Sequence, residues 1–205
     1  NGALHIYKYT KGQGSAPLGY IATEIDYSHY HLRFQYKWGS KRFGSRSQKK
    51  RDSGLMYHCV GPDGVLAKTW PRCVELQVQE GDTGDALCLA GARYAVNIDP
   101  NARGLPSHIE GRYLSADEGG VPYTAKLWIA HGNVRDELSR WNTGELIVAG
   151  SDYAVHMVNG RANNRLTRLE QQGPDGQWIP LAGGRFLLQA ELAEVFYRNI
   201  EIKPI

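Results

Sequence analysis

A carboxylate and two amides share one face of a short segment, because Glu75, Gln77 and Gln79 alternate with apolar residues between positions 73 and 79. This two-residue period is that of a half-buried strand. Carboxylate and amide side chains are poor strand formers, and an acidic, glycine-rich turn follows at residues 81–85. We interpret the polar face as the wall of a groove that binds a polar ligand; a solvated sheet face is the alternative.

Glu75 and His58 are the candidate catalytic residues. The apolar run around His58 also has the pattern of a strand. If Leu55 and Tyr57 face the core, His58 faces the opposite way and can lie beside Glu75 in a neighbouring strand. Neighbouring groups can tune the pKa of a carboxylate on a groove wall. We therefore expect these two residues to act as base and acid, in an order that the sequence does not fix. The alternatives are a surface ion pair for Glu75 and a hydrogen-bonded structural role for His58.

A divalent cation is an alternative source of electrophilic catalysis. Asp82 and Asp85 are the candidate ligands, and Asp52, Glu75 and His58 offer further oxygen and imidazole donors. Their spacing matches no compact metal loop, so no cofactor is assigned with certainty. The candidate cations are Ca, Mg, Mn and Zn. The alternative is that the turn at 81–85 has a purely structural role.

The surrounding pattern is that of an all-β protein. Aromatic and apolar residues alternate with polar ones from 30 to 38, and the segment 185–191 alternates again, with Gln189 and Glu191 on one face. No long amphipathic helix competes. We predict roughly a dozen strands that close into a two-layer sandwich, with one sheet curved enough to bind a ligand on its outer face. The polar faces of 73–79 and 185–191 would line the concave outer face of one sheet.

The regular pattern is lost between about residues 97 and 140, where proline, glycine and charged residues dominate. Such a long irregular span in a compact domain is usually functional or mobile. We interpret it as a lid or rim over the groove, with short strands near 125–129.

Composition narrows the class of protein. The 205 residues, with 24 glycines and 10% aromatics, suit a single β-sandwich domain over 1–205. A formal net charge of +3 is too small to indicate nucleic acid. The basic loop at 41–51 is interpreted as solvated, with an anion site as the alternative. No run approaches the roughly 18 apolar residues of a membrane helix.

The three cysteines, Cys59, Cys73 and Cys88, show no metal-type spacing, so we expect buried free thiols, with one disulfide as the alternative. The first residue is Asn1 rather than Met. We therefore expect a processed or trimmed start, with a signal peptide removed. Oligomeric state is not fixed by the sequence.

Six segments, in order, resemble the 3-keto-disaccharide hydrolase domain, also described as a 3-keto-glucoside lyase and hydratase domain. The resemblance runs from about Tyr20 to Ile205 and is carried by Asp52-Ser53-Gly54-Leu55, Glu75-Leu76-Gln77, Trp141-Asn142, Val158-Asn159-Gly160, Gly184-Arg185-Phe186-Leu187-Leu188-Gln189 and the closing segment 196–202. It implies a concanavalin A-like jelly-roll sandwich of two antiparallel sheets, commonly exported by bacteria and hence periplasmic or extracellular. The resemblance also implies action on glycosides whose third ring carbon is a ketone. The family pattern has Asn at position 52 and usually Arg near position 58. This chain has Asp52 and His58 there, so two residues that differ from the pattern are ionisable and fall near the expected site.

A ketone at the third carbon acidifies the hydrogen on the second, so a base can remove that proton while the anomeric oxygen leaves; water then adds. The expected substrate is a sugar or glycoside. The candidate substrate-binding residues are Gln77, Gln189, Asp52, Trp141, Glu191 and Lys68. Trp70 and Tyr57 could also stack on a sugar, although core packing is the commoner fate of aromatic residues. Two alternatives stay open: a lectin-like carbohydrate-binding module, and an ordinary glycoside hydrolase that pairs Glu75 with Glu191.

Overall fold

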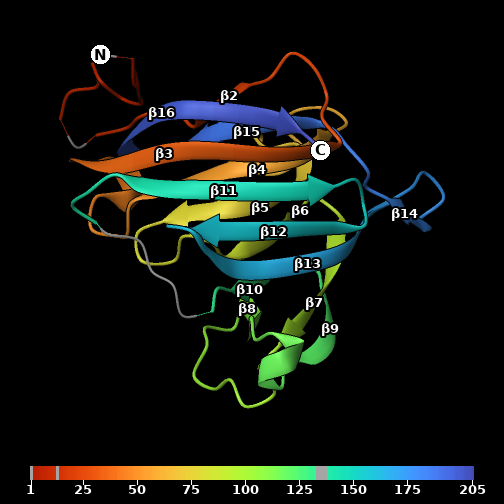
Figure 1. Cartoon of the computed structure of the whole chain (residues 1–205). Helices are drawn as coiled ribbons and strands as arrows, with labels where there is room; N and C mark the ends of the chain where they lie inside the picture. Colours follow the sequence, from red (N-terminus) through yellow and green to blue (C-terminus); the bar gives the residue numbers. More distant parts are fainter. Residues whose placement is uncertain (1, 13, 133–137) are drawn as a thin grey trace.

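The computed structural model describes residues 2–12, 14–132 and 138–205, which form two packed β-sheets (Figure 1). The nine-stranded sheet, called sheet A, has the order β1-β16-β3-β11-β12-β13-β7-β9, with β14 paired to β13. Its strands are β1 (Leu4–His5), β3 (His29–Arg42), β7 (Ala92–Ile98), β9 (Val121–Ala125), β11 (Asn142–Ala149), β12 (Tyr153–Val158), β13 (Arg161–Gln172), β14 (Trp178–Pro180) and β16 (Ala193–Pro204).

The seven-stranded sheet, called sheet B, has the order β2-β15-β4-β5-β6-β10-β8. Its strands are β2 (Gly19–Ala22), β4 (Asp52–Val60), β5 (Arg72–Gln79), β6 (Ala86–Leu89), β8 (Ile109–Arg112), β10 (Trp128–Ala130) and β15 (Arg185–Ala190). Two short 3-10 helices complete the structure, η1 (Gly44–Arg46) and η2 (Ala116–Glu118). The predicted all-β sandwich is confirmed. Among the described residues, no helix has the length and apolarity to cross a membrane.

The core lies between the sheets and explains which residues face outward. From sheet A, the aromatic face of β3 is buried, including Phe34 and Tyr36; from sheet B, Leu76 of β5 packs in the same core. Because side chains alternate along a strand, burial of Val74, Leu76 and Val78 turns the polar residues of β5 to the outer face of sheet B. The face predicted from the 73–79 pattern is therefore confirmed.

A β-bulge changes the course of β4. His58 has a positive φ of 50°, and the pairing of β4 with β5 shifts register between Tyr57 and Val60. The bulge turns His58 inward, where its Nε2 donates a hydrogen bond to the carbonyl oxygen of Gly150 at 2.9 Å. The predicted register, in which His58 lies beside Glu75, is wrong because strict alternation ends at Tyr57.

The span from 97 to 140 is more regular than its composition indicates. It supplies β8 and β10 to the edge of sheet B and β9 to the edge of sheet A, and these strands lie at the bottom of Figure 1. Residues 133–137 are outside the described part. The expected short strand is present as β10, so the irregular span is in large part ordered sheet.

Two further sequence questions are answered by the core. All three cysteines are buried free thiols, as predicted. The alternation of His156 with apolar residues at 153–158 fits either a core or a site position. The structure shows it fully buried between the sheets, where its Nε2 lies 3.0 Å from the hydroxyl of Tyr57. Burial lowers the pKa of His156 to about 4, so the imidazole is neutral near pH 7.

Candidate functional site

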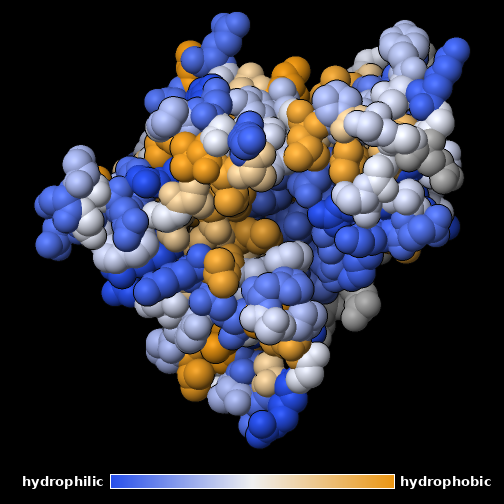
Figure 2. All heavy atoms as spheres, turned by 180° about the vertical axis from the view of Figure 1, so that it is seen from behind, coloured by the Kyte–Doolittle hydropathy of each residue, from blue (hydrophilic) through white to orange (hydrophobic). Residues whose placement is uncertain are grey.

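A cavity of about 470 Å³ opens on the outer face of sheet B. Its polar wall comes from the centre of the sheet and from η1, and consists of Arg46, Asp52, Glu75, Gln77, Gln79, Gln189 and Glu191. Its apolar wall comes from the 61–71 loop, β6 and the edge strand β10, and includes Leu66, Trp70, Leu87, Leu89, Leu127 and Trp128. Figure 2, which views the molecule from behind, shows a hollow with a hydrophilic flank and an apolar flank. A sugar has polar edges and apolar faces, and both walls suit it.

The strand register determines which side chains meet in the cavity. Gly54 of β4 lies opposite Gln77 of β5, and β15 runs along the other side of β4. A Cβ on Gly54 would overlap the carboxylate of Glu75 and would lie 2.8 Å from Oε1 of Gln189. Because position 54 is glycine, the carboxylate and the amide can both lie over the backbone of β4.

One cation holds two of the three carboxyl groups in the cavity. The Arg46 guanidinium forms an ion pair with Asp52 and a second one with Glu191, at 2.8 Å. Asp52 also accepts a hydrogen bond from Nε2 of Gln79 at 2.8 Å. Glu75 makes no hydrogen bond or ion pair with the described part of the chain, so its carboxyl group is available to a ligand.

Burial and mutual repulsion raise the pKa values of the carboxyl groups. Desolvation, followed by the charges of Glu191 and Asp52, raises the pKa of Glu75 well above its ordinary range. Desolvation and Glu191 raise the pKa of Asp52 to about 8, against the opposing effect of Arg46. Carboxyl groups with such pKa values can carry a proton near neutral pH and exchange it with a bound molecule.

Three buried acceptor atoms of the cavity have no hydrogen-bond partner among the residues that the structure describes. They are Oδ1 of Asp52, Oε1 of Gln77 and Oε1 of Gln189. Buried polar atoms are normally hydrogen-bonded, so three unpartnered acceptors on one wall indicate a ligand with several donors. Sugar hydroxyl groups are donors of this kind.

Three sequence-predicted site residues lie elsewhere. His58 is between the sheets, as described above, and burial lowers its pKa. Trp141 does not line the cavity: its ring stacks on the guanidinium of Arg198 at 3.9 Å, next to β3 and β16 of sheet A. Lys68 is exposed in the 61–71 loop and is not part of the cavity wall. The structure therefore removes these three from the proposed site.

The two candidate metal ligands have protein partners. Asp82 pairs with Lys50 at 2.5 Å, and Asp85 accepts hydrogen bonds from Trp128 and His131. Among the residues that the structure describes, no group of three or more His, Cys, Asp or Glu side chains is arranged to hold a metal ion. The turn at 81–85 instead connects β5 to β6, and Asp85 in this turn is hydrogen-bonded to Trp128 and His131 at the edge of sheet B.

Sequence reasoning missed several residues of the cavity. Arg46 lies in the basic loop at 41–51, for which the expectation is a solvated loop; its guanidinium instead pairs with two carboxylates of the cavity. The alternative of an anion site in this loop stays a prediction. Gln79, by contrast, lies on the predicted polar face of 73–79 and lines the cavity with Glu75 and Gln77. Trp128 and His108 come from the 97–140 span and line the cavity, so the expectation of a rim is confirmed.

Comparison with family sequence profiles gives a match over nearly the whole chain. The sequence profile of the 3-keto-alpha-glucoside-1,2-lyase-like domain matches residues 1–203. No curated protein gives a significant match.

Three solved structures have a similar fold. Two are proteins of Parabacteroides distasonis with the provisional description of glycosyl hydrolase: one has a TM-score of 0.56 and 16% identity and covers 100% of this chain and 88% of its own. The other has a TM-score of 0.52 and 15% identity, with 99% and 81% covered. The third is the carbohydrate binding module CBM66 from Bacillus subtilis, with a TM-score of 0.51, 9% identity and coverages of 92% and 83%.

Proposed function

The chain belongs to the family of 3-keto-alpha-glucoside-1,2-lyase-like domains, and from this premise we propose that it cleaves the glycosidic bond of 3-keto-glycosides by elimination followed by hydration. Membership makes it a carbohydrate-active domain. The observation that carries the finer proposal is the carboxyl group of Glu75, which is buried, has a raised pKa and faces an open polar cavity without a protein partner.

The first step needs a base for the hydrogen on the second ring carbon and an acid for the departing oxygen. Asp52 has a pKa of about 8, so its ionised form is a stronger base than an ordinary carboxylate, and we assign it the removal of this proton. The electron pair of the broken C–H bond forms the double bond between the first and second carbons as the anomeric C–O bond breaks. Glu75, protonated because of its raised pKa, gives its proton to the departing oxygen.

The other polar residues bind and orient the sugar. The unpartnered Oε1 atoms of Gln77 and Gln189 accept hydrogen bonds from ring hydroxyl groups. Arg46 supplies positive charge beside the ketone, whose oxygen gains negative charge during proton removal. The second step is the addition of water across the new double bond, with the acid and base roles reversed. The net reaction is hydrolysis of the glycoside.

The test uses two 3-keto-glucosides that differ in leaving group, a disaccharide and a 4-nitrophenyl glycoside. A 4-nitrophenolate leaves without an acid, whereas a sugar alkoxide does not. We expect Glu75→Gln to reduce kcat/KM by roughly 10²–10⁴-fold on the disaccharide and much less on the nitrophenyl glycoside, and Asp52→Asn to reduce both. Circular dichroism should show that both variants are folded.

Full turnover of both substrates by Glu75→Gln would refute the role of Glu75. Equal loss on both substrates would instead make Glu75 the base. Binding of unmodified glycans by the wild-type protein without turnover of either 3-keto-glucoside would favour a carbohydrate-binding module. Turnover of unmodified glycosides would favour an ordinary glycoside hydrolase with Glu75 and Glu191 as its carboxyl pair.

A further inference from the structure

A second cavity, of about 400 Å³, adjoins the first at the edge of sheet B. The two cavities share Gln79, His108 and Trp128 as lining residues. The remaining wall comes from the 104–106 segment, β8, the end of β10, the 81–85 turn and Lys50. The proposed acid–base chemistry uses none of this second wall.

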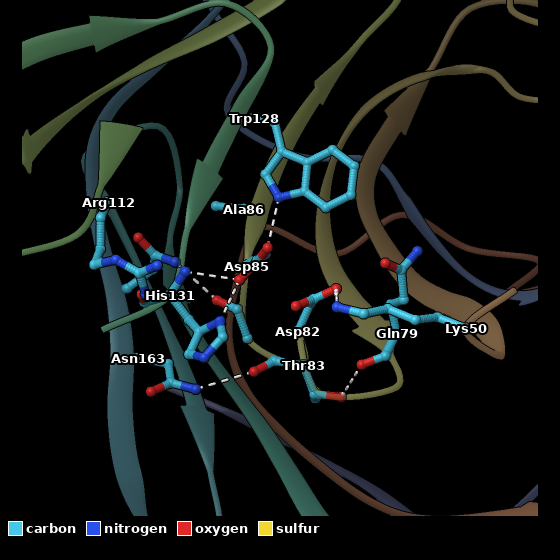
Figure 3. A network of polar contacts seen from close by, with 12 residues as sticks. Lys50, Gln79, Asp82, Thr83, Asp85, Ala86, Arg112, Trp128, His131 and Asn163 are labelled. Carbon is cyan, nitrogen blue, oxygen red and sulfur yellow. Dashed lines mark hydrogen bonds and ion pairs between the residues drawn. The ribbon is translucent and has the colours of Figure 1, made fainter. Parts of the chain in front are cut away.

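The wall of the second cavity contains a hydrogen-bonded pair formed by Asp85 and His131. Nδ1 of His131 lies 2.5 Å from Oδ1 of Asp85, and the backbone N–H of His131 donates to the same oxygen at 2.6 Å. The indole N–H of Trp128 donates to the other oxygen, Oδ2, at 2.6 Å. Figure 3 shows the carboxylate of Asp85 between Trp128 and His131. These contacts fix the orientation of the imidazole ring.

The second nitrogen of this ring, Nε2, has no hydrogen-bond partner within residues 2–12, 14–132 and 138–205. Nε2 is buried, and His131 as a whole is only 4% exposed, although the residue lines the cavity. With Nδ1–H donated to the carboxylate of Asp85, Nε2 of the neutral ring is an acceptor. A buried acceptor of this kind calls for a donor from a ligand.

The charges around His131 indicate what kind of ligand fits. The carboxylate of Asp82 is paired with Lys50 at 2.5 Å, and that of Asp85 receives the three hydrogen bonds above. Arg112 donates one hydrogen bond, to the carbonyl oxygen of His131 at 3.2 Å, and has no carboxylate partner in the described residues. The cavity therefore has the acceptor Nε2 of His131 in a lining residue next to the donors of the Arg112 guanidinium group. An uncharged molecule with hydroxyl groups, which both donate and accept, matches this set.

We propose that the second cavity is a carbohydrate subsite that holds the leaving sugar of a 3-keto-disaccharide, with Nε2 of His131, positioned by Asp85, bonded to one of its hydroxyl groups. The identification of the occupant as a leaving group rests on the proposed function. The cavity's capacity to bind a sugar does not.

The kinetic test compares a 3-keto-disaccharide with methyl 3-keto-glucoside, whose leaving group is too small to reach a second cavity. His131→Asn keeps an amide N–H in the position of Nδ1 and removes only Nε2. We expect it to raise KM for the disaccharide up to about tenfold, the cost of one hydrogen bond, and to leave the methyl glycoside unchanged. His131→Gln, whose longer amide reaches the position of Nε2, should restore part of the loss.

His31→Asn is the matched control, because His31 also contacts a carboxylate, Glu145 at 2.9 Å, but lies on β3 of sheet A and lines neither cavity. Equal effects of His131→Asn on both substrates, or no effect on either, would overturn the leaving-group assignment.

A binding test separates this proposal from the proposed function and does not depend on any variant being folded. Long-range 1H–15N spectra of the wild-type imidazole groups, recorded while glucose is added to millimolar concentration, should show a shift of the His131 Nε2 resonance and none for His31. No shift of His131 would overturn the sugar subsite. A shift in a protein that turns over no 3-keto-glycoside would support the sugar subsite and refute the proposed function.

Discussion

The carboxylate of Glu75 occupies the space in which a Cβ on Gly54 would lie. The two residues come from adjacent strands and are diagonal neighbours on the same face. Glu75 lies opposite Met56, and Gly54, two residues before Met56, lies opposite Gln77. The side chain of Glu75 therefore crosses the backbone of β4 diagonally toward Gln189. Because Gly54 has no side chain, Glu75, the proposed acid, and Gln189, a proposed sugar-binding residue, can meet over the backbone of β4.

Replacement of Gly54 by alanine tests this arrangement. The added methyl group would displace the Glu75 carboxylate, so we expect at least a tenfold loss of kcat/KM on a 3-keto-glycoside and destabilisation by about 1–3 kcal/mol, as for other overpacked sites. Gly19→Ala in the same sheet is the control, because nothing lies within 4 Å of its added Cβ. Unchanged activity in Gly54→Ala would show that the position of Glu75 is not critical.

Asp52 should make the protein less stable as the pH rises. Its pKa is raised from 3.8 to about 8, so between these values the unfolded chain releases a proton that the folded chain retains. The stabilising contribution is complete below about pH 4 and is lost as the pH rises toward 8. Asp52→Asn should reduce the fall in Tm between pH 5 and pH 8 by several degrees, since 1 kcal/mol corresponds to roughly 2–4 °C in a chain of this size.

A thermal scan at each pH checks this expectation. Asp175→Asn, in the exposed turn before β14, is a suitable control and should leave the pH dependence as in the wild-type protein. A steeper fall in Asp52→Asn than in the wild type would contradict the direction of the shift.

Arg46 should set the pH range of activity. Its charge lowers the pKa values of both Asp52 and Glu75, so its removal should raise both. We expect Arg46→Gln to move the acidic and basic limbs of the kcat/KM profile to higher pH by about one unit. Arg46→Lys should give a smaller shift, because lysine keeps the positive charge but not the guanidinium group that contacts both carboxylates.

Arg168→Gln, on the exposed part of β13, provides the comparison for the loss of an arginine. A profile that falls in height without moving along the pH axis would assign Arg46 a role in binding alone.

Two tryptophans on opposite sides of the molecule should behave differently. Trp70 lines the cavity, whereas Trp141 stacks on Arg198 beside sheet A. We expect Trp70→Leu to raise KM for a 3-keto-glycoside several-fold through loss of an aromatic surface for the sugar ring, and Trp141→Leu to leave KM unchanged. Isothermal titration with a non-hydrolysed sugar gives a second measure of the same difference, and equal affinities for the two variants would count against the apolar wall.

The sequence predicts the site best where local periodicity is unbroken. Alternation in β5 correctly placed Glu75 and Gln77 on one face, because burial of Val74 and Leu76 requires it. Alternation failed at His58, because one extra residue in a bulge reverses the face of every residue after it, and no residue type at this position announces the bulge.

Pattern alone does not place residues that lie outside the strands. Trp141 and Arg46 both stand in polar surroundings in the sequence, yet one lies beside sheet A and the other meets Asp52 on sheet B. Only the packing of the sheets decides between these outcomes. The 97–140 span was underestimated for a related reason: β8 and β10 pair in parallel, through a connection that short-range patterns do not reveal.

The two walls of the main cavity originate in different kinds of structure. The carboxyl and amide groups come from the central strands β4, β5 and β15, with Arg46 as the one contribution from η1, whereas much of the apolar surface comes from the 61–71 loop and the edge strand β10. Insertions and substitutions are tolerated more readily in loops and at edges than in central strands. Divergence among related proteins can therefore change the apolar surface offered to a sugar ring while the proposed proton-transfer groups stay in place, and engineering of specificity in the main cavity should begin at the 61–71 loop.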